Sequence, residues 1–245
     1  MSAGKPYSVT GYPSLDSTHS RALRDFPGLS DGAVITALRQ DVGRGRLGRT
    51  WLSEGKGLYF TIVLKPAAPR PEVFPCYTHL LSVSVCAALE RLGLSPSIKW
   101  PNDVLCGGGK ICGILAEAVT EGGRPVGAVV GAGVNLSQET ADLAGLDRPA
   151  VSVAMLRGGA APERGDLLSA VLEGFFGRRP ALEERGFPAI AADYRRRAGF
   201  IGKPVKLRAA SGEVSEGTAD IDDAGLLVLD GPGGRVSAAG GETEP

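Results

Sequence analysis

The sequence contains little that would assign it to a membrane, secreted or nucleic-acid-binding class. Its longest uninterrupted apolar runs, such as PVGAVVGAGV, reach about half of the roughly 20 residues that span a bilayer. The N-terminal segment MSAGKPYSVTGYPS lacks the apolar core of a signal peptide. Lys and Arg number 27, as do Asp and Glu, so the basic excess common in nucleic-acid binders is missing. We therefore expect a cytoplasmic protein that binds neither membrane nor nucleic acid.

Cysteine and histidine are also scarce. The four cysteines, Cys76, Cys86, Cys106 and Cys112, show no paired CxxC spacing, so no zinc site is expected. Without an export signal they should be reduced thiols. What the chain does contain is 43% hydrophobic residues over 245 positions, which is enough for a sizeable core.

The apolar pattern predicts an α+β fold. Apolar residues at spacings of three and four over 76–92 predict a helix with one buried face. The other expected elements are strands at 33–40 and 57–64, strands in SIKWP, KICGILAEAV and PVGAVVGAGVNL with a hairpin turn at 123–125, and helices at 163–177 and 181–198. Because strands and helices do not alternate regularly, we expect a mixed or antiparallel sheet covered by helices.

After Phe200 the sequence breaks into short strand-like pieces separated by Gly, Asp and Pro. This pattern predicts a small β-barrel at 201–245, following a larger domain at 1–200. Between Ala209 and Pro245 there are eight Asp or Glu residues and one Arg. Such a run is usually a solvated acidic surface.

The most informative segment is the arginine loop, Gly43–Trp51, which follows a predicted strand. Its glycines let the backbone approach a ligand closely. Its arginines, Arg44, Arg46 and Arg49, carry planar, permanently charged groups that suit phosphate or carboxylate. The composition predicts an anion-binding loop that closes over its ligand.

Two other interpretations of the arginine loop stay open at this point. Gly43, Gly45 and Gly48 have the spacing of a dinucleotide-binding fingerprint, but that motif requires a helix to begin within it. The following TWLSEGKG has no helical period. The loop could also be exposed and without function, although three like charges so close together favour an anionic partner.

A second polar segment, Lys99–Val104, follows a short predicted strand. Pro101 stiffens the turn, and Asn102 and Asp103 supply hydrogen-bonding groups. An ordinary polar turn beside a core tryptophan would have the same composition. The segment is therefore a site candidate only in combination with the arginine loop.

Lys110 follows three glycines and resembles the end of a phosphate-binding GxxxxGK[ST] motif. Val104 and Ile111 occupy the positions where that motif needs Gly and Ser or Thr, so the match fails. Strand alternation predicts that Lys110, Cys112 and Ile114 share one face of their strand. A lysine at a strand start is often simply exposed.

Other polar residues lie near the ends of predicted elements. Ser17 or Thr18 suits the N-cap of a helix. His19 could act as a general base, but a surface or capping histidine is the more common case. Asn135 ends a strand and could cap a turn. Cys112 could be a nucleophile, but a buried strand cysteine is more common.

In combination and in this order, these segments resemble the biotin protein ligase family. The matching pieces are LDST (15–18), Gln40, GRGRLGRTW (43–51), KWPNDV (99–104), GGGKICGILAE (107–117) and GAGVNL (131–136). The resemblance covers residues 12–205, and the C-terminal piece resembles the family's SH3-like barrel. It implies a class II synthetase-like catalytic fold with that barrel appended.

The resemblance implies three sets of site residues. Those expected around biotin are Ser17, Thr18, His19, Gln40, Arg44, Gly45, Arg46, Lys110 and Gly113. Those expected around the nucleotide are Arg44, Arg46, Arg49, Trp51, Asn102, Asp103 and Asn135. The expected catalytic set is Lys110, Arg46 and Asp103. His19 stands where the family usually has Asn, which leaves that polar contact undetermined.

The implied activity is ATP-dependent formation of biotinyl-5'-AMP, followed by transfer of biotin to a lysine of a biotin carboxyl carrier protein. Mg²⁺ is expected to arrive with ATP, without a separate protein metal site. A homodimer is a further expectation, because several family members dimerise through sheet edges. LDST already lies at residue 15, so the DNA-binding domain of some members, and repression by it, are not expected.

Two alternative functions follow from the same residues. A lipoate protein ligase or octanoyl transferase shares the catalytic fold, and the transferase would need a cysteine nucleophile such as Cys112. A non-catalytic biotin sensor would bind the ligand without transferring it. The combination of the arginine loop and KWPND favours the biotin ligase.

Overall fold

The structure, a computed structural model, describes residues 4–209 and 211–244 and is built around a seven-stranded sheet. In spatial order the strands are β1 (Ser8–Leu15), β2 (Ala33–Gln40), β3 (Gly57–Leu64), β7 (Arg124–Asn135), β6 (Gly109–Glu121), β5 (Asp103–Cys106) and β4 (Ser97–Lys99). Strands β1 and β2 pair in parallel, and the other neighbours in this sheet pair antiparallel. The expected mixed sheet is therefore confirmed.

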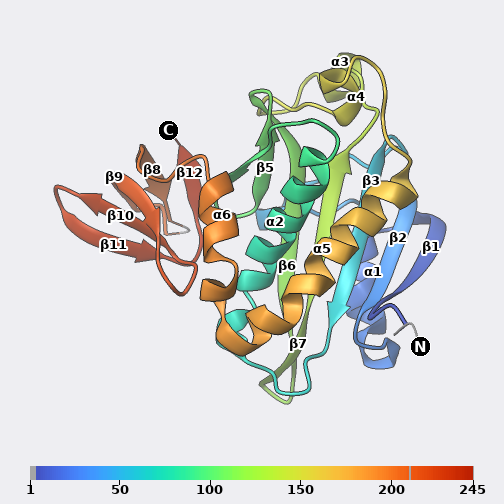
Figure 1. Cartoon of the computed structure of the whole chain (residues 1–245), viewed down its shortest axis with the longest axis horizontal. Helices are drawn as coiled ribbons and strands as arrows, with labels where there is room; N and C mark the ends of the chain where they lie inside the picture. Colours follow the sequence, from blue (N-terminus) through green and yellow to red (C-terminus); the bar gives the residue numbers. More distant parts are fainter. Residues whose placement is uncertain (1–3, 210, 245) are drawn as a thin grey trace.

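Helices cover both faces of this sheet. Their bounds are α1 (Thr18–Asp25), α2 (Cys76–Glu90), α3 (Thr140–Leu143), α4 (Val153–Leu156), α5 (Arg164–Arg185) and α6 (Ala191–Arg197), with 3₁₀ turns at Phe26–Gly28, Arg46–Gly48, Pro71–Val73 and Phe187–Ala189. Figure 1 shows α2, α5 and α6 across one face. On the other face α1 packs through Ala22 in a smaller core of its own.

The helix predicted at 76–92 is α2, but it is buried nearly all round rather than on one face. It lies between the sheet and helices α5 and α6, so apolar side chains on every side find partners (Figure 1). By length and composition the stretch Pro71–Glu90 could also cross a membrane. Most of it is buried inside this fold, as in the core helix of a globular protein.

The helices predicted at 163–177 and 181–198 are divided differently in the structure. Helix α5 continues through Pro180 to Arg185, and the break comes at Gly186, whose φ is 71°. A proline inside a helix removes one backbone hydrogen bond. Here the buried side chains of Phe175, Phe176 and Leu182 hold the helix against the core on both sides of Pro180.

Strands β6 and β7 form the predicted hairpin, but its turn falls one residue earlier than expected. Gly122 and Gly123 make the turn with φ of 56° and 78°, and Arg124 already belongs to β7. Positive φ costs glycine little, which explains the glycine pair. The hairpin supplies two adjacent central strands of the sheet, and the site is built on them.

The C-terminal part forms an antiparallel five-stranded sheet of the SH3-like type. Its spatial order is β11 (Gly234–Ala238), β10 (Leu227–Gly231), β9 (Val214–Ile221), β8 (Pro204–Arg208) and β12 (Glu242–Glu244). Its buried residues, such as Leu207 and Ile221, belong to the same core cluster as the large sheet. The domain limits 1–200 and 201–245 stay a prediction.

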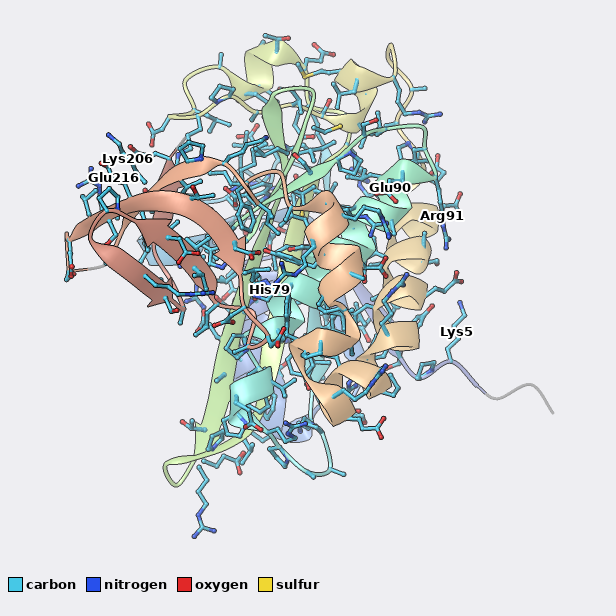
Figure 2. The ribbon with its side chains drawn as sticks, turned by 60° about the vertical axis from the view of Figure 1, so that its left-hand side comes forward. Lys5, His79, Glu90, Arg91, Lys206 and Glu216 are labelled. Carbon is cyan, nitrogen blue, oxygen red and sulfur yellow. The ribbon has the colours of Figure 1, made fainter. Side chains whose placement is uncertain are left out.

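One polar contact joins the two sheets through α2. His79 Nε2 lies 2.9 Å from the carbonyl oxygen of Gly225, so the ring nitrogen donates. The His79 ring also packs edge-on against Phe187 and Tyr194, with centroids at 5.5 and 4.8 Å. Figure 2 shows His79 between the small sheet and the helices.

Candidate active site

Two neighbouring cavities lie at the end of the large sheet where the arginine loop leaves β2. The wider one, of about 270 Å³, is lined by the arginine loop, the KWPND segment, residues 143–150 and Gly241–Thr243. The narrower one, of about 50 Å³, is lined by Ser17, Gln40 and the glycine-rich centres of β6 and β7. Arg46, Asn102 and Lys110 line both cavities and so mark their junction.

The arginine loop folds back on itself as a short hairpin. Trp51 N–H donates to the Gly43 carbonyl at 2.9 Å, and Gly45 N–H donates to the Arg49 carbonyl at 2.7 Å. Its tip is a single 3₁₀ turn in which Leu47 has a φ of 55°. No α-helix begins in the loop, so the dinucleotide-binding interpretation is wrong.

Each arginine of the loop has its own oxygen acceptor. Arg44 Nη2 lies 2.9 Å from Glu117 Oε1, and Arg46 Nη1 donates to Asn102 Oδ1 at 3.0 Å. Arg49 pairs with Glu242 of β12. Burial lowers the pKa of Arg46, while the charge of Asp103 opposes the shift. Three cationic groups are thus spread along the two cavities at defined positions.

Lys110 faces the cavities and pairs with Asp103. Its Nζ lies 2.7 Å from Asp103 Oδ1 and 5.2 Å from the centroid of the Trp51 ring. A β-bulge between β5 and β6 pairs Leu105 with Lys110 but Val104 with Cys112. The extra residue changes the alternation of side chains, so Lys110 does not share a face with Cys112 and Ile114 as predicted.

Cys112 points into the core instead. It is fully buried, and burial raises its pKa well above the usual thiol range. A thiol that does not ionise is a poor nucleophile. The octanoyl transferase alternative therefore finds no activated cysteine here. All four cysteines are free and buried, in agreement with the predicted reduced thiols.

Trp51 lies against the backbones of β6 and β7 at two glycines. A Cβ atom on Gly113 would come within 2.8 Å of the indole, and one on Gly133 would come closer still. Glycine at these positions lets the ring lie close to the strands. The same Cβ on Gly113 would come within 3.2 Å of Lys110 Nζ, so Gly113, Trp51 and Lys110 form one surface.

A chain of polar side chains lines the inner end of the narrow cavity. Ser17 caps α1, because its Oγ accepts from the His19 and Ser20 amides at 3.2 and 3.4 Å. Gln40 Oε1 accepts from Thr18 Oγ1 at 3.1 Å, and its amide donates to Ser53 at 2.8 Å. The capping interpretation of Ser17 is confirmed, and the side chain still borders the cavity.

His19 is buried, contrary to the expected surface or capping histidine. Its Nε2 lies 3.1 Å from Glu117 Oε1, the carboxylate oxygen that also contacts Arg44. Burial lowers the pKa of His19 to about 4, although Glu117 opposes the shift. At neutral pH the imidazole is therefore uncharged. Because Nε2 faces the Glu117 carboxylate, the neutral ring keeps its donor on that side and leaves Nδ1 as an acceptor.

Asn135 borders the wide cavity, but its amide is committed to the protein. Its Nδ2 donates to the carbonyls of Val151 and Lys110 at 3.0 and 3.3 Å, and its Oδ1 accepts from Gln138. This arrangement fits the structural role considered above, in which Asn135 fastens the strand end. A contact with nucleotide stays a prediction.

The structure thus brings every predicted site residue to these two cavities or their walls. Sequence reasoning missed Glu117, Arg148, Ser53 and Glu242, which pair with or border the predicted set. Glu117 ends the GILAE segment, so its place there was a signal that could have been used. Nothing in the sequence around Arg148 or Glu242 indicates that these two distant residues meet.

Residues 11–135 match the Biotin/lipoate A/B protein ligase family, and residues 200–243 match the Biotin protein ligase C terminal domain. The chain belongs to this family. The second match also identifies the small sheet as the family's C-terminal domain.

Individual relatives point the same way. The chain is 34% identical to a biotin--[acetyl-CoA-carboxylase] ligase of Paracoccus denitrificans over 90% of this chain and 93% of that protein. It is 31% identical to the bifunctional ligase/repressor BirA of Bacillus spizizenii and spans 65% of its length. The biotin protein ligase from Aquifex aeolicus in complex with biotin and ATP superposes with a TM-score of 0.83 at 28% identity over 97% of each chain.

Proposed function

We propose that the protein is an ATP-dependent biotin protein ligase, which forms biotinyl-5'-AMP and transfers biotin to a lysine of a biotin carboxyl carrier protein. The observation that carries the proposal is the junction of the two cavities. Arg46, Asn102 and Lys110 stand where a narrow polar cavity meets a wider cationic one. Biotin in the first and ATP in the second would bring the carboxylate and the α-phosphate together at these side chains.

The first step needs no protein nucleophile. The biotin carboxylate attacks the α-phosphorus of ATP, a P–O bond forms, and pyrophosphate leaves. Both reactants are anions, so orientation and positive charge lower the barrier most. Arg46 and Lys110 supply that charge at the junction, and the contact with Asp103 fixes the Lys110 ammonium in place.

We propose that Mg²⁺ enters the site with ATP. Within residues 4–209 and 211–244 no group of three His, Cys, Asp or Glu side chains is arranged to hold a metal. Asp103 is the acidic side chain nearest the junction, and it is engaged with Lys110. Mg²⁺ bound to the ATP phosphates would neutralise charge on the leaving pyrophosphate.

In the second step the neutral amine of the carrier lysine attacks the carbonyl carbon of the mixed anhydride. A C–N bond forms, AMP leaves with the bonding electron pair, and the amine loses a proton. Asp103 is the nearest carboxylate that could orient this amine. The acceptor we propose is the carrier domain of acetyl-CoA carboxylase, because two relatives carry acetyl-CoA-carboxylase in their names.

Three further features belong to the same proposal. We place the enzyme in the cytoplasm, because its four cysteines are unpaired. We expect no DNA binding, given the balanced charge. We also propose a homodimer that forms through edge strand β1, since this strand is largely exposed along its length.

One experiment separates this function from its alternatives. The protein is incubated with ATP, Mg²⁺, biotin and a carrier domain, and the carrier is weighed by mass spectrometry. Addition of one biotinyl group supports the ligase. Lipoate-dependent and biotin-independent pyrophosphate release would favour a lipoate ligase, and tight biotin binding without transfer would favour a sensor.

A further inference from the structure

The C-terminal sheet reaches into the wide cavity at one carboxylate. Glu242 of β12 accepts from Arg49 through Oε1 and from Arg148 through Oε2, the latter at 3.0 Å. The strand itself is fixed, because Thr243 Oγ1 donates to the Trp100 carbonyl at 3.0 Å and β12 pairs with β8. Glu242 is therefore held at the cavity by its backbone, whatever its side chain does.

The two arginines belong to the part of the wide cavity that lies away from biotin. Both border the wide cavity, and neither borders the narrow one. Positive charge is concentrated here. Burial lowers the pKa of neighbouring Lys99, and the charge of Arg148 lowers it further. The α-phosphate already has Arg46 and Lys110 at the junction, so Arg49 and Arg148 are left for another anion.

We propose that Arg49 and Arg148 bind the β- and γ-phosphates of ATP, and that Glu242 is a positioning residue that competes with these phosphates for the two guanidinium groups. This inference rests on the proposed function. The carboxylate presents one oxygen to each arginine, as two linked phosphates would. Binding of ATP breaks both contacts, and departure of pyrophosphate restores them.

Competition of this kind lowers the apparent affinity for the triphosphate tail. The competent fraction of the protein is the fraction in which Glu242 has released the arginines. Two partly exposed ion pairs favour the paired state by about fourfold, so the competent fraction is about one fifth. Removing the carboxylate charge should therefore tighten binding about fivefold. AMP lacks the outer phosphates and should bind equally well with or without Glu242.

The test is calorimetric binding of inorganic pyrophosphate with Mg²⁺, of ATP and of AMP to the full chain. Glu242→Gln should bind pyrophosphate and ATP about fivefold more tightly and AMP as before. Arg148→Gln should weaken pyrophosphate and ATP several-fold. Combining Glu242→Gln with Arg148→Gln should remove most of the gain, because one of the contested guanidinium groups is gone.

Glu216→Gln is the matched control. Glu216 lies on β9 of the same sheet, 3.6 Å from Lys206, and Figure 2 shows the pair at the outer side of the small sheet. This change removes the same charge from the same sheet at a distance from the cavity. It should leave all three affinities unchanged.

Two results would overturn the inference. The first is that a Glu242→Gln protein with the thermal unfolding midpoint of the natural protein binds pyrophosphate no more tightly than the natural protein does. The second is that Glu242→Gln changes the affinity for AMP as much as the affinity for ATP, because AMP lacks the β- and γ-phosphates. Glu242→Asp keeps the charge, so its pyrophosphate affinity should lie closer to that of the natural protein than to that of Glu242→Gln. Because binding is measured without turnover, a protein that bound pyrophosphate as described but transferred no biotin would contradict the proposed function alone.

Discussion

At the scale of single residues, the site depends on cationic side chains that are each held in place by one neighbour. Lys110 is held by Asp103, Arg44 by Glu117, and Arg46 by the amide oxygen of Asn102. The pairing fixes where each cation points before the ligand arrives. Preorganised charge of this kind is more effective in catalysis than mobile charge, because no reorganisation accompanies the reaction.

Lys110→Ala should slow formation of the adenylate at least ~100-fold, equivalent to about 2.7 kcal/mol of transition-state stabilisation. Single-turnover formation of biotinyl-AMP measures the step directly. Lys206→Ala, which removes an exposed lysine on β8, is the control. A loss of less than tenfold for Lys110→Ala would remove Lys110 from the catalytic set.

Cys112→Ala should retain biotin transfer within about threefold, since the thiol is buried in the core and does not ionise at neutral pH. The expected cost is in stability, because a small cavity replaces the sulfur. Cys86→Ala, another buried thiol, serves as the comparison. Complete loss of transfer in a folded Cys112→Ala protein would revive the octanoyl transferase alternative.

At the scale of elements, sequence periodicity predicted the hairpin of β6 and β7, helix α2 and the short C-terminal strands, because each has a strong apolar pattern. Sequence periodicity gave the wrong prediction where tertiary contacts determine the local structure. The bulge that separates Lys110 from Cys112 follows from pairing with β5, and α5 continues through Pro180 because its flanks are packed. Strand β1 was missed, since SVTGYPSL is largely exposed and contains Gly and Pro.

In the site, too, local sequence patterns predicted some features, and tertiary contacts determined the others. Glycines and arginines in one loop predicted an anion site from local sequence. The ion pairs of Glu117 with Arg44 and of Glu242 with Arg148 join distant segments, and no local pattern encodes them. The buried state of His19 was missed for the same reason, because the strands that cover it come later in the chain.

Arg46→Ala should let the adenylate escape, because Arg46 is the loop cation at the junction of the cavities. The dissociation rate of biotinyl-AMP, followed by chase with unlabelled biotin, should rise by about tenfold, as expected for loss of one charged contact. Arg39→Ala is the control, since that arginine lies at the end of β2 and pairs with Asp41. An unchanged dissociation rate would contradict the closing role of the loop.

At the scale of the whole molecule, the small sheet is part of the same core as the large one and also borders the wide cavity. His79 links the two sheets from a fully buried position. Its Nε2 donates to the Gly225 carbonyl oxygen. In the described part of the chain its Nδ1 is buried without a hydrogen-bond partner. A second proton on this ring would therefore introduce a charge that nothing nearby accepts.

This burial predicts how stability depends on pH. Burial lowers the pKa of His79 from 6.5 to about 4, so between these values the unfolded chain takes up a proton that the folded chain refuses. The contribution of His79 to stability is therefore full above pH 6.5, falls as the pH decreases toward 4, and changes no further below that. The shift corresponds to about 3 kcal/mol. Chemical denaturation at several pH values between 7.5 and 4 should show the loss.

His79→Gln keeps a donor for the Gly225 carbonyl but cannot titrate. It should be less stable at pH 7, because the ring packing is lost, yet its free energy of unfolding should vary less between pH 6.5 and 4. His19 is the second of the chain's two histidines and has its pKa lowered to about 4 as well, so His19→Asn is the matched variant. Combining both substitutions should leave only the titration of carboxylates. If His79→Gln lost stability with pH as steeply as the natural protein, His19 and the carboxylates would account for the acid sensitivity and His79 would not.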